Sequence, residues 1–155
     1  MIREATPEDF NSISKLIKNE QELFYIYPSG KFPLTNTQIK ELYEARKDFT
    51  VLIQKDKIIG FANLYDYLKN RFVFIGNVVI DEEYRGLGKG KKLISHMINL
   101  AKNSYLLPEV RISVFADNTD ALLLYMDLGF ELYTKETKKN YQNDDVLLLH
   151  LRMVF

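Results

Sequence analysis

The hydrophobic positions of this chain follow two periods, one of two residues and one of three to four. Short segments that alternate, or are apolar throughout, predict strands at 2–5, 49–54, 58–68, 72–80 and 110–115. The tail from residue 130 predicts two more strands around a polar turn. The segment 72–80 (FVFIGNVVI) is apolar almost without a break, which predicts a central strand covered on both faces.

Helices are predicted where apolar residues recur every three to four positions. Thr6 and Pro7 mark the start of one helix, whose apolar positions continue through Phe24. Others are predicted from about 37 to 46, from the glycine-rich stretch after 80 to about 105, and over 117–130, where Gly129 suits a left-handed stop. The order β-α-α-β-β-β-α-β-α-β-β predicts one α/β domain, 1–155, with a mixed sheet and helices.

Composition excludes several function classes. The 21 basic residues equal the 21 acidic ones, so we expect no dedicated nucleic-acid binder, although one local basic pocket is compatible with this balance. The absence of cysteine excludes disulfides, thiol catalysis and cysteine-ligated zinc, and neither His96 nor His150 has a metal-like spacing, so no metal is expected. No apolar run approaches the roughly 18 residues of a membrane span. No secretory leader is recognisable at the N-terminus, so we expect a cytoplasmic protein without membrane contact.

The stretch YRGLGKGKKL (84–93) predicts an anion-binding loop at the start of a helix. Gly86, Gly88 and Gly90 allow the backbone to curve closely around a ligand, and Lys89 and Lys91 add positive charge. Free N–H groups at a helix start suit a pyrophosphate. The alternative is an ordinary glycine turn followed by a solvated basic helix start.

Two nucleotide-binding patterns fail at this loop. A Walker loop requires glycine where Arg85 stands and Ser or Thr where Lys92 stands. A Rossmann fingerprint requires its third glycine one residue later, in an early parallel βαβ unit. The third pattern, R-x-x-G-x-G over Arg85, Gly88 and Gly90, resembles the central motif of the GNAT superfamily of N-acetyltransferases. Glu82 departs from it where proline is common.

A second motif supports the same resemblance. NTDALLLYMDLGF (118–130) contains N-x-x-A-x-x-x-Y, which is similar to the family's helix beside the pantetheine arm of coenzyme A. Asn118, Ala121 and Tyr125 lie at i, i+3 and i+7 on one helix face. A tyrosine with a pKa near 10 stays protonated at neutral pH and can donate to a leaving thiolate. Tyr125 is therefore the candidate general acid, and a packed core tyrosine is the alternative.

The resemblance implies a fold, a cofactor and a set of binding residues. It implies a mostly antiparallel sheet of six to seven strands, with about four helices and with 72–80 and 110–116 splayed apart. Acetyl-CoA would lie in the slot, with the thioester oxygen at a backbone N–H of residue 78 or 79. The implied cofactor-binding residues are Val78, Val79, Ile80, Arg85, Gly86, Leu87, Gly88, Lys89, Gly90, Lys91, Asn118, Ala121 and Tyr125.

The acceptor site is less defined. By resemblance it is shaped by the first helices and the last hairpin, where Tyr27 and Phe32 belong to an aromatic stretch that suits an amine. Asp66 and Asn77 are further candidates on the strands. The general base stays unassigned, because segment 72–80 contains no acid, and His96 and His150 are interpreted as structural.

The leading hypothesis is a monomeric or homodimeric N-acetyltransferase that passes the acetyl group of acetyl-CoA directly to a primary amine. An acetyl-cysteine intermediate is excluded by composition. The alternative is a non-catalytic CoA-binding regulatory module of the same fold. The sequence leaves the acceptor open among protein N-termini, polyamines, amino acids and aminoglycosides.

Overall fold

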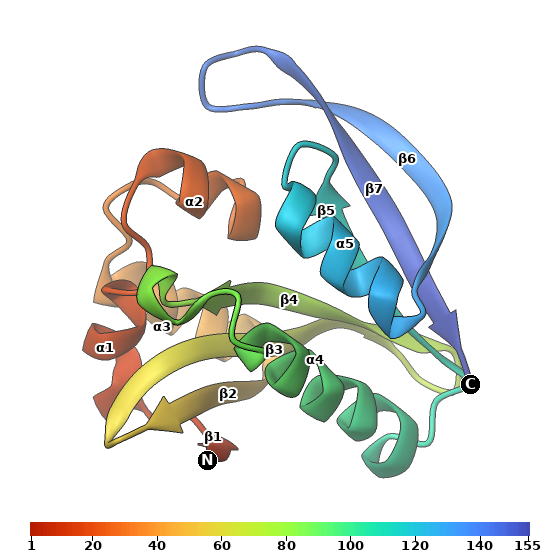
Figure 1. Ribbon diagram of the computed structural model, residues 1–155, viewed down its shortest axis with the longest axis horizontal. Coiled ribbons are helices and arrows are strands. Elements are labelled where there is room, and N and C mark those ends of the chain that lie inside the picture. The colour runs from red at the N-terminus through yellow and green to blue at the C-terminus, as the bar shows by residue number, and fades with distance from the viewer.

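Seven strands form one sheet in the computed structural model, which describes all 155 residues (Figure 1). The spatial order is β1-β2-β3-β4-β5-β7-β6, and every neighbouring pair is antiparallel except β4 and β5. The apolar segment predicted to be central is β4, fourth of the seven strands. The strands are β1 (Ile2–Glu4), β2 (Lys47–Gln54), β3 (Lys57–Leu68), β4 (Phe72–Ile80), β5 (Glu109–Phe115), β6 (Glu131–Lys139) and β7 (Asp145–Val154).

The parallel pair β4–β5 opens into a fork. These strands pair only at Phe74–Arg111 and Ile75–Ile112, although β4 continues to Ile80 and β5 to Phe115. Asn77, just beyond the last pair, has a left-handed φ of 49° at an irregularity in the β3–β4 register. Such an extra residue bends a strand, so β4 turns away from β5 at this point. The predicted splay of the central strands is confirmed.

Two hydrophobic clusters lie on opposite faces of the sheet. Val51 and Leu52 are neighbours on β2 and point to opposite faces, one into each cluster. On one face pack α4 (Lys89–Asn99) and α5 (Thr119–Leu128), and on the other α1 (Phe10–Ser14) and α3 (Asn36–Ala45). α2 (Glu20–Ile26) contacts β4 beside the fork.

The first predicted helix is wrong in its continuity. A 3-10 turn (Pro7–Asp9) and α1 end at Ser14, and α2 begins only at Glu20. Leu16 and Ile17 in the break are buried, so their apolar spacing reflects packing of a non-helical segment. Asn19 then starts a new helix, because its side chain accepts a hydrogen bond from the backbone N–H of Glu22 (2.8 Å).

The remaining elements follow the expected pattern closely. All seven predicted strands are present, and α3 lies within one residue of its predicted bounds. α4 is extended by a π-helical turn, Leu100–Ser104, which ends one residue short of the predicted limit. Gly129 ends α5 at a φ of 110°, as predicted for a left-handed stop.

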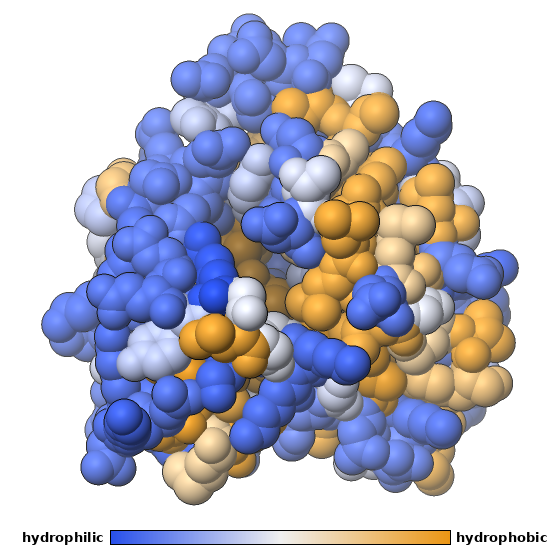
Figure 2. Space-filling view, viewed as in Figure 1, coloured by the Kyte–Doolittle hydropathy of each residue, from blue (hydrophilic) through white to orange (hydrophobic).

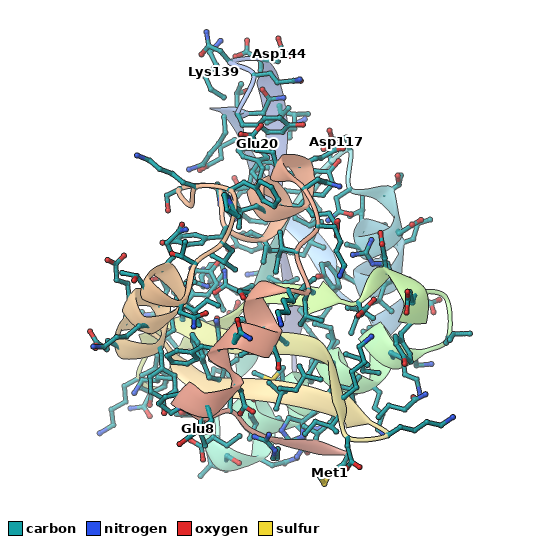
Figure 3. All side chains as sticks on the ribbon, turned by 90° about the vertical axis from the view of Figure 1, so that its left-hand side faces the viewer. Met1, Glu8, Glu20, Asp117, Lys139 and Asp144 are labelled. Carbon is teal, nitrogen blue, oxygen red and sulfur yellow. The ribbon has the colours of Figure 1, made fainter.

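The β6–β7 hairpin projects beyond the helices. In Figure 3 its tip, marked by Lys139 and Asp144, stands above the α2 residue Glu20. Tyr141 at this tip lies against Phe24 of α2, with ring centroids 6.0 Å apart. No helix in the structure is both long enough and apolar enough to cross a membrane.

Candidate active site

A cleft of about 990 Å³ runs through the fork between β4 and β5. Figure 2 shows the hollow at the centre of this face, between apolar residues over α5 and polar residues over α2. Its lining comes from α2, β3, β4, the glycine loop, β5, the first turns of α5, and the hairpin strands β6 and β7. Two motifs about 40 residues apart in sequence therefore face one cavity.

The glycine loop forms one end of the cleft. Gly86 and Gly88 have left-handed φ angles of 75° and 79°, which favour glycine, and Gly88 is the residue that starts α4. A Cβ placed at either residue would meet no atom within 4 Å, so this surface is open for a ligand. The first N–H groups of α4 have no intrahelical partner. Open backbone, free N–H groups and the helix dipole together fit a pyrophosphate.

Most of the predicted cofactor residues line the cleft. Leu87, which is 64% exposed, does not line it, and Lys89 lies instead in a separate hollow with β2 and β3. The lining residues from the predicted set are Val78, Val79, Ile80, Arg85, Gly86, Gly88, Gly90, Lys91, Asn118, Ala121 and Tyr125.

Arg85 is already engaged within the protein. Its Nε donates to the carbonyl of Ile80 (2.9 Å), and its Nη2 pairs with Glu22 of α2 (2.9 Å). The guanidinium thus joins α2 to the end of β4, and residues of both elements line the cleft. A phosphate contact by Arg85 stays a prediction, and the observed contacts assign it a supporting role.

The free edge of β4 faces the fork. The N–H of Asp81 donates to the carbonyl of Ile59 on β3 (2.7 Å), so alternation directs the N–H groups of Val78 and Ile80 away from β3. Of the two N–H groups proposed for the thioester oxygen, that of Val78 therefore points towards the cleft, and that of Val79 towards β3.

Helix α5 contributes the second motif with one correction. Asn118 precedes the helix as its N-cap residue, so it does not share a helix face with Ala121 and Tyr125 as predicted, although all three line the cleft. The prediction extended the helix too far towards its N-terminus because Asp117 and Asn118 both resemble capping residues.

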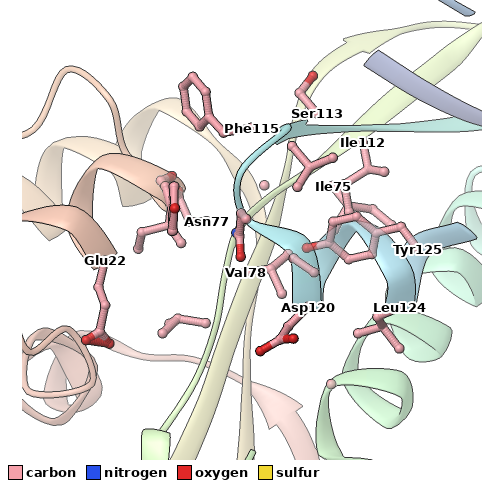
Figure 4. A pocket seen from close by; sticks show the side chains of 18 of the residues that line it. Glu22, Ile75, Asn77, Val78, Ile112, Ser113, Phe115, Asp120, Leu124 and Tyr125 are labelled. Carbon is pink, nitrogen blue, oxygen red and sulfur yellow. The ribbon is translucent and has the colours of Figure 1, made fainter. Parts of the chain in front are cut away.

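Tyr125 reaches from α5 towards the fork. Figure 4 shows its hydroxyl directed into the space beside Val78. The residue is 5% exposed, its hydroxyl has no hydrogen-bond partner in the protein, and no fully buried polar side-chain atom lacks one. The hydroxyl therefore retains contact with the cleft. Burial raises the pKa of Tyr125, so the phenol remains protonated at neutral pH.

The other face of the fork carries a polar cluster. The guanidinium of Arg46 donates to the amide oxygens of Asn63 (3.2 Å) and Asn77 (2.9 Å) and lies 4.1 Å from the centre of the Tyr65 ring. Tyr65 covers Gly76, where a Cβ would approach its ring to 2.6 Å. This glycine is the first β4 residue after the last pair with β5, so the cluster lies at the fork.

The predicted acceptor residues divide into two pairs. Asp66 and Asn77 line the cleft, whereas Tyr27 and Phe32 do not. Tyr27 packs over Gly30 beside the α1–α3 cluster, and Phe32 is 40% exposed. The amide of Asn77 is satisfied internally, since its oxygen accepts from Arg46 and Asn63 and its nitrogen donates to Ile26 (2.6 Å).

Sequence reasoning gave no role to Ser113 or Glu136 at the acceptor end, and it interpreted His150 as structural. Ser113 and His150 face each other across β5 and β7, and Glu136 of β6 follows on the same side. Ser113 alternates with the buried residues Ile112 and Val114, which shows the face it occupies, whereas β6 has no buried residue that would show the face of Glu136. Which face of the sheet lines the cleft depends on the order of the strands, and these residues do not indicate that order.

Comparisons with known proteins agree with this geometry. Residues 13–130 match the model of a family described as "Acetyltransferase (GNAT) family". The spermine/spermidine N(1)-acetyltransferase of Bacillus subtilis (strain 168) is 28% identical over 137 residues, covering 84% of this chain and 86% of that protein. The [ribosomal protein bS18]-alanine N-acetyltransferase of Haemophilus ducreyi is 29% identical over 144 residues, covering 91% and 88%.

A solved structure shares the whole fold. Spermidine N-acetyltransferase from Vibrio cholerae, in complex with CoA and spermine, superposes with a TM-score of 0.83. The match covers 99% of this chain and 94% of that one at 18% identity. At this identity the likeness establishes the fold.

Proposed function

This chain belongs to the acetyltransferase (GNAT) family and is an acyl-CoA-dependent acetyltransferase that uses acetyl-CoA, and we propose that it transfers the acetyl group directly to a primary amine. The observation that supports direct transfer is the cleft, which joins the glycine loop, the fork and the polar acceptor face in one cavity. An amine that enters from the α2 side could reach the thioester in the fork directly. The transfer would then need no covalent enzyme intermediate.

The residues present fit acetyl-CoA. The open backbone at Gly86 and Gly88 suits the pyrophosphate, and the free edge of β4 suits the amide groups of the pantetheine arm. When bound, acetyl-CoA supplies the acetyl group as a thioester. The N–H of Val78 would hold the thioester oxygen, where negative charge develops during transfer.

Tyr125 is the proposed general acid. Its hydroxyl is free of protein partners, reaches the cleft, and belongs to a phenol whose pKa is raised by burial. A phenol that stays protonated can donate to a departing thiolate, which lowers the barrier to C–S cleavage. Tyr125 approaches the fork from the α4–α5 face, opposite the side open to an acceptor.

We propose an acceptor amine carried on a cationic aliphatic chain. Two carboxylates of the cleft, those of Asp66 and Asp117, have no ion-pair partner in the protein, and the rings of Tyr25 and Phe74 line the same cavity. Glu136 and Tyr65 also line it, but Lys138 pairs with that carboxylate and Arg46 stacks on that ring. Carboxylates attract additional ammonium groups, and aromatic faces attract cations and cover methylene groups. A polyamine fits this lining better than a peptide N-terminus, which carries a single charge among neutral amides.

An amine panel with acetyl-CoA tests this function. Spermidine, spermine and putrescine should release free CoA, and mass spectrometry should find one acetyl group on a terminal amine. A short alanine-initiated peptide, an amino acid and an aminoglycoside complete the panel. Preference for the peptide would contradict the polyamine class and leave amine acetylation intact. Failure of every amine in the panel to release free CoA would instead favour the non-catalytic CoA-binding module.

A further inference from the structure

Three side chains at the acceptor face form a continuous polar chain. The Oγ of Ser113 lies 2.7 Å from Nδ1 of His150, and Nε2 of His150 lies 3.5 Å from Oε2 of Glu136. The three residues come from β5, β7 and β6, and all three line the cleft. A purely structural pair would not require the serine to open into the substrate cavity.

The position of Ser113 places one end of this row of polar side chains at the reaction centre. Ser113 directly follows Ile112, the last β5 residue paired with β4, so it stands at the fork on the β5 side. Ile112 packs into the α4–α5 cluster, and alternation turns Ser113 to the opposite face. Ser113 and Tyr125 therefore approach the fork from opposite faces of the sheet. In Figure 4 the Tyr125 hydroxyl points towards Val78, whereas the Ser113 hydroxyl points away from Tyr125 on the other side of β5.

The partners of His150 define the direction of proton flow. A neutral His150 that accepts a proton from Ser113 must present the lone pair of Nδ1 to the serine, and its own proton is then on Nε2, the nitrogen 3.5 Å from the carboxylate of Glu136. The pKa of Glu136 is lowered, first by Lys138 and then by His150, so it is a carboxylate at neutral pH. An imidazolium formed at His150 would thus face a negative charge.

Other groups around His150 complete its electrostatic surroundings. Lys138 pairs with Glu136 at 3.2 Å, and the Tyr133 ring lies 6.3 Å from the imidazole. Arg111 pairs with Glu109 at 2.8 Å and stacks 3.7 Å from the Phe72 ring, so its charge is partly neutralised. The charged and titratable neighbours are Arg111 from β5, Tyr133, Glu136 and Lys138 from β6, and Tyr65 from β3.

We propose that Ser113 and His150 remove the proton from the acceptor amine, which supplies the general base that β4 lacks. This inference rests on the proposed function. Ser113 is the catalytic residue that contacts the ammonium group, and His150 and Glu136 act through it. The ammonium gives a proton to Ser113 Oγ while the hydroxyl proton of Ser113 passes to Nδ1 of His150.

Acetyl transfer follows the removal of this proton. The freed nitrogen lone pair forms the C–N bond, the C–S bond breaks, and its electron pair leaves with sulfur. Tyr125 protonates that sulfur. The same nitrogen, which already gave one proton to Ser113, then gives a second proton to Tyr125 and becomes the amide nitrogen. His150 returns its proton to solvent, so each turnover yields the amide, free CoA and one proton.

Two variants test the relay with spermidine, or with the amine that the wild type is shown to acetylate. Ser113→Ala and His150→Gln should each lower kcat by about 100-fold, the lower range for general base catalysis, and leave CoA affinity unchanged. His96→Gln is the matched control, because His96 lies on α4 outside the cleft. It should keep wild-type kcat.

Two readouts separate a proton relay from a structural role. The deficit of both variants should shrink as pH rises towards about 10, because a free amine then loses its proton unaided. It should also shrink for a fluorinated amine of the same length, whose ammonium is more acidic. A kcat loss below about twofold, or one equal at every pH and for both amines, would overturn the relay.

A measurement without turnover gives an independent answer. In the complex with CoA and the amine, the bound ammonium should donate a hydrogen bond to Ser113, which in turn donates to His150, so the Nδ1 resonance of His150 should shift and the resonances of His96 should not. The shift should be absent in Ser113→Ala. An unmoved His150 resonance, or an acetyl group found on Ser113, would overturn the relay. Wild-type turnover alongside either result would remove the relay and leave the proposed function in place.

Discussion

Polar side chains in this cleft differ in whether the protein itself already supplies their hydrogen-bond partners. The amide of Asn77 uses its oxygen and its nitrogen to join β3, α2 and Arg46, so it shapes the bend of β4. Tyr125 is as well buried, yet its hydroxyl has no protein partner. A buried donor that faces an open cleft remains available to a ligand. The contrast assigns Asn77 to structure and supports the proposed role of Tyr125 as general acid.

Replacing Tyr125 with Phe should lower kcat by about 100-fold, because the variant lacks only the proton donor. Thermal stability should hold, since no hydrogen bond within the protein is lost, and CoA affinity should remain near the wild-type value. Steady-state kinetics, calorimetric CoA titration and a melting curve measure the three quantities.

Tyr43→Phe is the control for this change, because Tyr43 packs between Phe10 and Phe49 away from the cleft. Wild-type kcat in Tyr125→Phe would rule out the acid role.

At the scale of the element, the glycine loop and α4 form one structural unit at the proposed pyrophosphate site. The left-handed angles at Gly86 and Gly88 turn the backbone so that α4 starts at the cleft. The apolar face of α4, with Leu93, Ile94 and Met97 fully buried, fixes the helix against the sheet. The direction of the free N–H groups is therefore set by core packing.

Replacing Gly88 with Asp should weaken CoA binding by at least about tenfold, a cost of about 1.4 kcal/mol, because a carboxylate would face the pyrophosphate. Gly88→Asn is the matched control: it has nearly the same size without the charge, and asparagine tolerates a positive φ.

Gly88→Asn should lose much less CoA affinity than Gly88→Asp when both variants are titrated with CoA by calorimetry. Equal CoA affinity in Gly88→Asp and the wild type would contradict the position assigned to the phosphates.

At the scale of the whole molecule, the sheet is two halves joined at a narrow seam. Strands β1 to β4 form one half and β5, β7 and β6 the other, with only two residue pairs between β4 and β5. The wide end of the fork is the cleft, so the site exists because the sheet is incomplete there. A ligand strand in the fork would supply hydrogen bonds that β5 does not make.

Acetyl-CoA should therefore stabilise the whole protein. At about 100 times its Kd, a ligand that binds only the folded state adds about 2.7 kcal/mol to the free energy of unfolding. Hydrogen exchange should slow at the fork-facing amides of Val78 and Ile80 and change little at β1. A raised melting temperature without added protection at Val78 would place the ligand outside the fork.

The sequence determined the local features of this protein. Alternation and apolar runs predicted all seven strands, and the spacing of Gly86, Gly88, Gly90 and Tyr125 predicted the family, because such patterns record local backbone geometry and a fixed cofactor. Apolar spacing misled at residues 15–19, where burial of Leu16 and Ile17 imitates a helical period.

Only the tertiary structure decided what surrounds the acceptor. Ser113, Glu136 and His150 lie on three strands whose adjacency depends on the order β5-β7-β6, and no pattern within any one strand specifies its neighbour. Tyr27 and Phe32 lie outside the cleft, and the prediction missed this for the same reason. An aromatic residue in the sequence indicates that its side chain packs, but it does not indicate against which partner. Chemistry carried by one segment could be predicted, whereas chemistry shared between segments required the packed sheet.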